Sequence, residues 1–281
     1  MTNNTLPEGI FIKKGKVKGK TVAIFGGIHG NEKVGVKMID ILRKELEVQA
    51  GTVYLVYGNP KAIKQNKRFI EKNLNRCFKK GNKGETLEDK RAMELMKILD
   101  ECDALLDLHA FPNSQGEPFA ICEQEAFDIA EKFNVPVISS GWGKTEPGAT
   151  EGYMYNNGKI GIGIECGSDR VGNRTESLER AKFVTDIFLK YFGCINGKMI
   201  IDNASKKYVK VFKAIIRKSK NFKFSRNYKN FDSLKEGEIF AIENRKKFIA
   251  KKDECIVLPT PNEPIGGEIC ILGREIKSSK K

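Results

Sequence analysis

The pattern that most constrains the fold is found in the first 190 residues, where short apolar runs alternate with segments whose apolar residues recur at helical spacing. Thr86 and Asp89 have capping-box-like spacing at the start of one helical stretch. Alternating strands and helices predict an α/β fold with a mixed, mostly parallel sheet flanked by helices. We expect strands near residues 21–25, 52–57, 104–108, 119–121, 135–138 and 160–165, and helices from about 31, 86 and 175.

The pattern changes after Gly193, where turn residues separate short β-like runs and no helical spacing recurs. We therefore predict two domains, an α/β domain over residues 1–197 and a smaller all-β domain over residues 198–281. The expected strands of the second domain are Met199–Ile201, Val209–Ile216, Glu238–Ile242, Cys255–Leu258 and Glu268–Leu272.

Bulk composition indicates a water-soluble protein of the cytoplasm. No run of about 18 apolar residues is present, so we expect no membrane span. The first eleven residues lack the basic and apolar regions of a secretory signal. The seven cysteines are scattered without a C-x-x-C pair, which predicts reduced thiols. The sequence leaves open whether the chain forms a homo-oligomer.

Positive charge is concentrated near the C-terminus. Residues 201–281 carry 20 of the 50 basic and 10 of the 36 acidic side chains, which is +10 of the net charge of +14. Such asymmetry is one mark of nucleic-acid binding. No nucleic-acid-binding motif accompanies it, so we favour a solvated lysine-rich face and keep nucleic-acid binding as a minor alternative.

The chain has two histidines, His29 and His109, and each lies just after a predicted strand. Ligands bind at the carboxyl ends of strands in open α/β sheets. Glu32 follows His29 by three residues, a spacing that places both on one face of a helix beginning there. Two imidazoles and one carboxylate form the ligand set of catalytic zinc sites. We predict a metal site at these three residues, best suited to zinc, with cobalt or manganese as alternatives.

Two further carboxylates accompany this site. Asp107 is a candidate outer partner of His109, although we expect its side chain to point away from that histidine on a regular strand. Glu165 ends an apolar run and so lies at a strand terminus. Burial there would raise its pKa and suit it to proton transfer, while a buried glutamate paired with a lysine is the alternative.

The segment Arg68–Phe78 is too polar for a core. Arginine is the usual residue for bidentate recognition of a carboxylate, and Asn75 beside Arg76 offers amide donors for the same anion. Arg68 is placed to stabilise a developing oxyanion. Surface arginines are the alternative explanation from composition alone.

Together these segments resemble the succinylglutamate desuccinylase/aspartoacylase family, a branch of the zinc carboxypeptidase superfamily. The resemblance covers about residues 20–170, and the change to a β module also fits the family. It rests on Gly-Gly-Ile-His-Gly-Asn-Glu at 26–32, Asn-Pro at 59–60, Arg68 with Asn-Arg-Cys-Phe at 75–78, Asp-Leu-His at 107–109 and Ile-Glu-Cys-Gly at 164–167.

The resemblance implies a hydrolase in which one Zn²⁺ per chain is held by His29, Glu32 and His109. Its substrate would be a small N-acyl amino acid, cleaved at the amide bond to a carboxylate and a free amino acid. A peptidase of the same superfamily, acting on a peptide C-terminus, is the alternative.

The resemblance also implies roles for four other residues. Glu165 would activate water and then protonate the leaving amine. Arg68 would polarise the substrate carbonyl. Asn75 and Arg76 would hold the α-carboxylate of the amino acid.

Two departures from the family pattern affect the substrate. Asn73 stands where relatives have Asp, which we expect to alter the support of Arg76. Residues 151–157 lack the arginine with which aspartoacylase-like members bind an acidic side chain. This disfavours an N-acyl aspartate and leaves the acyl group unidentified. The candidates for the missing contact are Tyr153, Tyr155 and Arg170.

Overall fold

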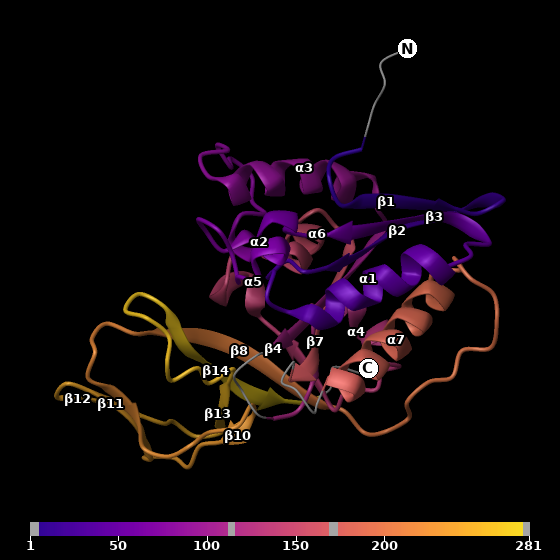
Figure 1. Cartoon of the computed structure of the whole chain (residues 1–281). Coiled ribbons are helices and arrows are strands. Elements are labelled where there is room, and N and C mark those ends of the chain that lie inside the picture. Colours follow the sequence, from indigo (N-terminus) through magenta and orange to yellow (C-terminus); the bar gives the residue numbers. More distant parts are fainter. Residues whose placement is uncertain (1–5, 112–115, 169–173, 278–281) are drawn as a thin grey trace.

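One mixed sheet forms the centre of the molecule, and its strands come from both halves of the chain (Figure 1). The structure is a computed structural model that describes residues 6–111, 116–168 and 174–277. In spatial order the eleven strands of this sheet are β1 (Ile10–Lys14), β3 (Ala50–Tyr57), β2 (Val17–Gly26), β4 (Ala104–Phe111), β7 (Ile160–Ser168), β5 (Phe119–Ile121), β6 (Val137–Ser140), β8 (Lys207–Ile216), β14 (Glu268–Ile276), β13 (Glu254–Val257) and β10 (Asp232–Ser233).

The prediction of a mixed sheet flanked by helices is confirmed. β3, β2, β4 and β7 are parallel neighbours, and β5, β6 and β8 form a second parallel group. β5 runs antiparallel to β7, and the pairs beyond β8 are all antiparallel. Helices of the described residues are α1 (Lys33–Glu45), α2 (Pro60–Gln65), α3 (Leu87–Glu101), α4 (Phe127–Ala130), α5 (Trp142–Thr145), α6 (Thr150–Asn156) and α7 (Arg174–Tyr191).

Helices cover both faces of the first half of the sheet (Figure 1). α1, α4 and α7 pack on one face, and α3 and α6 pack on the other. β2 shows why its sequence is a continuous apolar run. Ile24 is buried in the cluster with α1 and α7, whereas Ala23 and Phe25 are buried in the cluster with α3. A strand buried on both faces has no polar side to alternate with.

α3 begins with the predicted capping box. The Asp89 amide donates to Oγ1 of Thr86 at 3.1 Å, and the Thr86 amide donates to Oδ2 of Asp89 at 3.2 Å. These bonds satisfy amides that have no partner within the helix. They fix where α3 starts and therefore where its apolar face meets the sheet.

The C-terminal segment is all β within the described residues, as predicted. β8, β14, β13 and β10 continue the main sheet, and a separate antiparallel sheet consists of β12 (Lys246–Ile249), β11 (Ile239–Glu243) and β9 (Phe222–Phe224). The strand predicted at Met199–Ile201 is wrong, because this stretch lies outside the ladders of the sheets and Ile200 is 70% exposed. The domain boundary near residue 197 stays a prediction.

All seven cysteines are buried and free, which agrees with the prediction of reduced thiols. Within the described part of the chain, no helix combines the length and apolar character needed to cross a membrane.

Candidate metal centre and active site

The predicted site residues meet at the carboxyl ends of three parallel strands. His29 lies in the turn that follows β2, His109 lies near the end of β4, and Glu165 lies near the end of β7. Because β2, β4 and β7 are successive parallel strands, their carboxyl ends share one edge of the sheet. The sheet therefore brings together residues more than a hundred positions apart.

The turn at His29 is tighter than the predicted helical start. α1 begins at Lys33, and Glu32 occupies its N-cap position without capping the helix through its side chain. The Glu32 amide donates to the His29 carbonyl at 3.2 Å, which closes a turn. Gly30 in this turn approaches α2 so closely that a Cβ atom would lie 2.1 Å from the carbonyl carbon of Ala62. The turn thus leaves the Glu32 carboxylate free to face the histidines.

His29, Glu32 and His109 form a buried cluster of metal-ligand type. Nδ1 of His29 lies 2.7 Å from Oε1 of Glu32, and Nδ1 of His109 lies 3.0 Å from Oε2 of the same carboxylate. One ligand atom from each residue lies within 4.8 Å of the others. A single ion between these atoms would touch all three side chains.

The outer nitrogen of each histidine has its own partner. Nε2 of His109 lies 3.0 Å from Oδ2 of Asp107, and Nε2 of His29 lies 3.0 Å from Oδ1 of Asn73. The expectation that Asp107 points away from His109 is wrong, because side chains two residues apart on a strand share a face. The Asn73 side chain therefore supports His29, and its carbonyl also accepts from the Arg76 amide at 3.0 Å. Such partners fix ring orientation and leave both Nδ1 atoms to face Glu32.

The electrostatics of the cluster also suit a cation. Burial and the nearby Arg68 guanidinium lower the pKa of His29 to about 4. Burial opposes ionisation of His109, but the carboxylates of Asp107 and Glu32 raise its pKa well above the usual value. Burial likewise opposes ionisation of Glu32, but the two histidines hold its pKa well below the usual value. A buried carboxylate that stays ionised beside two imidazoles matches the donor set preferred by zinc.

Glu165 borders this cluster and has an unused oxygen. Its Oε2 atom is buried and has no hydrogen-bond partner among the described residues. Burial and the Glu32 carboxylate raise the pKa of Glu165 to about 8, against the lowering effects of His109 and Arg68. The predicted alternative, a glutamate paired with a lysine, does not match these surroundings, because the cations that act on Glu165 are His109 and Arg68.

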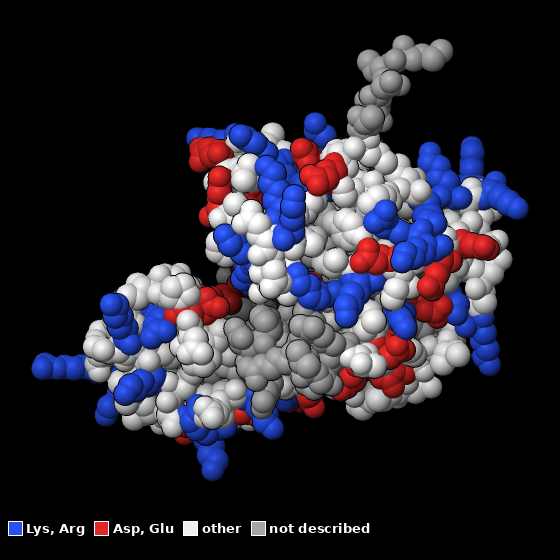
Figure 2. All heavy atoms as spheres, viewed as in Figure 1, with Lys and Arg blue, Asp and Glu red and all other residues white. Residues whose placement is uncertain are grey.

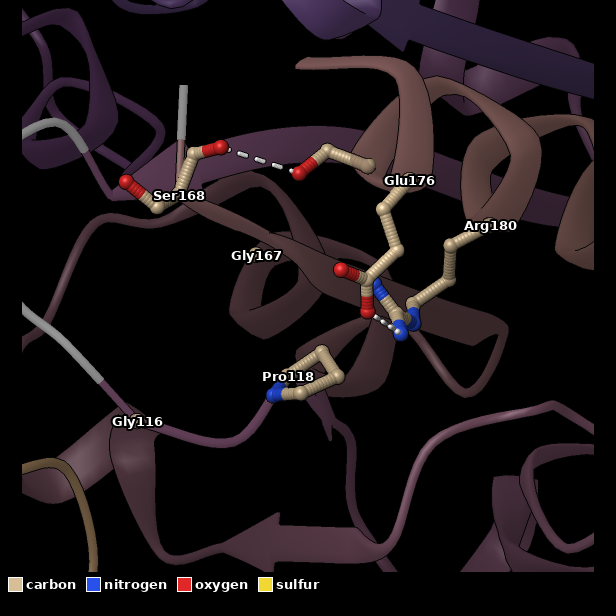
Figure 3. A pocket seen from close by; sticks show the side chains of 7 residues that line it. Gly116, Pro118, Gly167, Ser168, Glu176 and Arg180 are labelled. Atoms are coloured by element: carbon tan, nitrogen blue, oxygen red, sulfur yellow. Dashed lines mark hydrogen bonds and ion pairs between the residues drawn. The ribbon is translucent and has the colours of Figure 1, made fainter. Parts of the chain in front are cut away.

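The end of β7 is held by the start of α7 (Figure 3). Nη1 of Arg180 donates to the carbonyl of Cys166, the residue directly after Glu165, at 2.7 Å. The Ser177 hydroxyl donates to the Ser168 carbonyl at 3.0 Å. These residues border a small cavity of about 220 Å³. The Arg180 guanidinium is already bonded to Glu176 and to the Cys166 carbonyl. We therefore assign these residues the role of holding the strand that carries Glu165.

A larger cavity of about 730 Å³ opens above the cluster. Glu32, Arg68, Arg76 and Glu165 all contribute to its wall, whereas Asn75 does not. The C-terminal segment supplies much of the opposite wall. These lining residues are Ala214, Ile216, Leu258, Thr260, Glu263, Pro264, Ile265, Gly266, Gly267 and Glu268.

The predicted arginines reach the cavity with partners already in place. Nη1 of Arg68 donates to Oε1 of Glu32 at 3.1 Å. Arg76 forms an ion pair with Glu146 and donates to the Asn75 carbonyl. The side-chain oxygen of Asn75 accepts from the Thr150 amide at 3.1 Å, so it positions α6 against this segment.

Sequence reasoning missed the residue that shapes the arginine segment. The buried Glu88 carboxylate accepts hydrogen bonds from the backbone amides of Ile70, Glu71 and Lys72 and from Nδ2 of Asn59. Its position in the first turn of α3 suggested only helix-dipole complementarity. Glu146 and Glu268 were also missed, because neither belongs to a motif: Glu146 directly follows α5, and Glu268 follows the turn before β14.

The three candidates for the missing arginine contact differ in their positions. The Tyr153 hydroxyl donates to Oδ1 of Asp100 at 2.6 Å, and Tyr155 is 43% exposed. Neither contributes to the wall of the larger cavity. Arg170 lies outside the described residues.

The chain is similar to a known protein family and to several of its members. The family model described as the succinylglutamate desuccinylase/aspartoacylase catalytic domain matches residues 18–191. The succinylglutamate desuccinylase of Vibrio campbellii is 25% identical over 284 residues, covering 92% of this chain and 82% of that protein. A probable aspartoacylase of Nostoc sp. is 34% identical over 164 residues, covering 52% and 55% of the two chains.

The fold has close counterparts among solved structures. The crystal structure of succinylglutamate desuccinylase from Vibrio cholerae superposes with a TM-score of 0.81 at 20% identity, covering 97% of this chain and 87% of that one. The shared fold therefore includes the C-terminal strands as well as the sheet that carries the site. Since the family model spans well over half of the sequence, the chain belongs to the succinylglutamate desuccinylase/aspartoacylase family.

Proposed function

We propose that the protein is a zinc-dependent hydrolase that cleaves the amide bond of an N-acyl amino acid to a carboxylate and a free amino acid. The observation that carries this proposal is the buried cluster of His29, Glu32 and His109 beside the unpartnered oxygen of Glu165. Relatives named succinylglutamate desuccinylase and probable aspartoacylase support a deacylase.

One zinc ion per chain would be held by His29, Glu32 and His109. When bound, zinc supplies a Lewis acid that polarises a carbonyl and makes water more acidic. Glu165 accepts the proton of the attacking water through its free oxygen and later delivers it to the leaving amine. Its raised pKa suits both tasks, because a carboxyl that titrates near neutral pH exchanges protons readily in either direction.

The arginines would orient the substrate. Arg68 lies against Glu32 and therefore close to the reacting carbonyl, where its guanidinium stabilises the developing negative charge. Arg76 binds the α-carboxylate of the amino acid through two N–H donors, in a bidentate pair. Asn75 acts through its neighbours, because its side-chain oxygen already bonds to the backbone of α6.

We also propose residues 1–197 as the catalytic domain and residues 198–281 as a β domain that closes the cavity. Ile216, Leu258 and Thr260 of the C-terminal segment line the wall opposite the cluster. Such a wall narrows access to the site and disfavours the alternative, a peptidase acting on a peptide C-terminus. A small N-acyl amino acid is therefore the better fit.

Metal content tests the proposal. Elemental analysis of the purified protein should give about one zinc per chain, lost in Glu32→Ala and His109→Ala but retained in the surface variant Glu94→Ala. The zinc-loaded protein should hydrolyse N-acetyl amino acids and not a matched peptide. A folded protein that takes up no metal after zinc is added back would refute the hydrolase.

A further inference from the structure

The wall of the cavity above the cluster is rich in carboxyl groups, although the whole chain carries a net charge of +14. Lys and Arg side chains are spread over the face shown in Figure 2. The described cavity wall instead contains five glutamates, two arginines and no lysine. Glu32 and Glu165 belong to the metal centre. The others are Glu146, Glu263 and Glu268.

Glu146 and Glu268 come from distant parts of the chain and line the same cavity. Glu146 follows α5, and Glu268 begins β14 in the C-terminal segment. Burial and the Glu146 carboxylate raise the pKa of Glu268 to about 9, although Arg76 and Arg68 lower it. Glu268 therefore keeps its proton near neutral pH, because no cation close enough to it favours the ionised form.

Arg76 is the cation that this pair shares. Its guanidinium is ion-paired with Glu146 on the side of the cavity. A substrate carboxylate that binds Arg76 competes with Glu146 for the same donors. Once that happens, the Glu146 carboxylate has lost its cation and has only the protonated carboxyl group of Glu268 beside it, which is costly in a partly buried site.

From this charge distribution, and resting on the function proposed above, we propose that the substrate is an N-acyl derivative of a basic amino acid. Its α-carboxylate replaces Glu146 on Arg76, and its side-chain ammonium or guanidinium group binds between Glu146 and Glu268. The exchange gives the substrate carboxylate a cationic partner in Arg76 and gives Glu146 a new cation in place of Arg76. The substrate is thus selected by a carboxylate and a cation together.

An acidic substrate meets the opposite situation. A second carboxylate, as in an N-acyl aspartate or glutamate, would enter a wall that already holds Glu146, Glu263 and Glu268. Both cavity arginines are already paired, Arg68 with Glu32 and Arg76 with Glu146. Residues 151–157 supply no further arginine. Repulsion between the second carboxylate of the substrate and these glutamates disfavours binding.

A substrate panel with the zinc-loaded full chain tests the proposal. We expect kcat/KM for Nα-acetyl-L-lysine to exceed that for Nα-acetyl-L-leucine by about tenfold or more, with Nα-acetyl-L-glutamate lowest. Glu268→Gln should reduce the lysine-to-leucine ratio about tenfold. Glu236→Gln, an exposed glutamate of the same C-terminal segment, should leave the ratio unchanged. Equal or better hydrolysis of the leucine or glutamate derivative would overturn the proposal while leaving the deacylase intact.

Product binding separates this proposal from the function on which it rests. Calorimetric titration of the full chain with L-lysine, L-leucine and L-glutamate requires no turnover. Preferential binding of lysine, weakened in Glu268→Gln, supports the cationic subsite even if the acetyl group is the wrong acyl group. Binding of none of the three, or tighter binding of leucine or glutamate, overturns it. Loss of zinc uptake would instead refute the deacylase.

Discussion

His109 and Glu165 are direct neighbours in the parallel register between β4 and β7. The ladder of backbone hydrogen bonds, rather than a loop, therefore sets the spacing between the metal centre and the proposed base. Sites carried on strands hold their geometry more closely than sites carried on loops. This arrangement allows the metal and the base to be tested separately.

Glu165→Gln should abolish most activity and leave the metal in place. The amide is isosteric with the carboxyl but cannot accept the proton of water, so we expect kcat to fall about 10²–10⁴-fold. Zinc content, measured on the same sample, should remain near one per chain because Glu165 is outside the ligand cluster. Activity within a few-fold of the unmodified protein would exclude Glu165 as the base.

Asp107→Asn should weaken metal binding. Asp107 holds Nε2 of His109 and also accepts from the Thr150 hydroxyl, so its carboxylate both orients the ring and raises its basicity. Loss of such an outer partner typically lowers metal affinity about 10–100-fold. Competition with a chelator measures the change. Asp186→Asn, which removes a surface ion pair on α7, should have no effect.

Much of this site was predictable because its signals are local. The two histidines and Glu165 follow apolar strand patterns, and parallel strands bring their carboxyl ends together. The position of Asp107 was also decidable, since the period of a strand is two. The expectation failed by misapplying that period.

Other parts of the site depend on contacts that no local pattern encodes. Glu146 and Glu268 are 122 positions apart and line the same cavity only because β8 pairs with β6 and carries β14 beside the first half of the sheet. The strand expected at Met199–Ile201 failed for a related reason. Its composition favours β structure, but the chain there is an exposed connection with no partner strand beside it in the described sheets.

Glu88→Gln should destabilise the arginine segment. The carboxylate accepts three backbone N–H bonds and one amide N–H bond, and a glutamine would turn an amide group toward those donors. Leaving one such buried group unsatisfied costs about 1–3 kcal/mol. We expect a lower free energy of unfolding. We also expect a raised KM, because Arg68 and Arg76 belong to this segment and are proposed to bind the substrate. Urea denaturation and initial-rate kinetics measure both. Glu85→Gln, an exposed neighbour, should change neither.

Glu151 should make stability depend on pH. Burial raises the pKa of this α6 carboxyl from 4.5 to about 7, and the Asp107 carboxylate adds to the effect. Between these values the folded protein holds a proton that the unfolded chain has lost, so stability falls as pH rises through this window. Glu151→Gln removes this dependence. The free energy of unfolding of the variant, relative to that of the unmodified protein, should therefore rise by up to about 3 kcal/mol between pH 4 and pH 8. Thermal denaturation across this range, in one metal state, measures the gain, with exposed Glu47→Gln as the control. A difference that stays flat with pH would show that folding does not raise the pKa of Glu151.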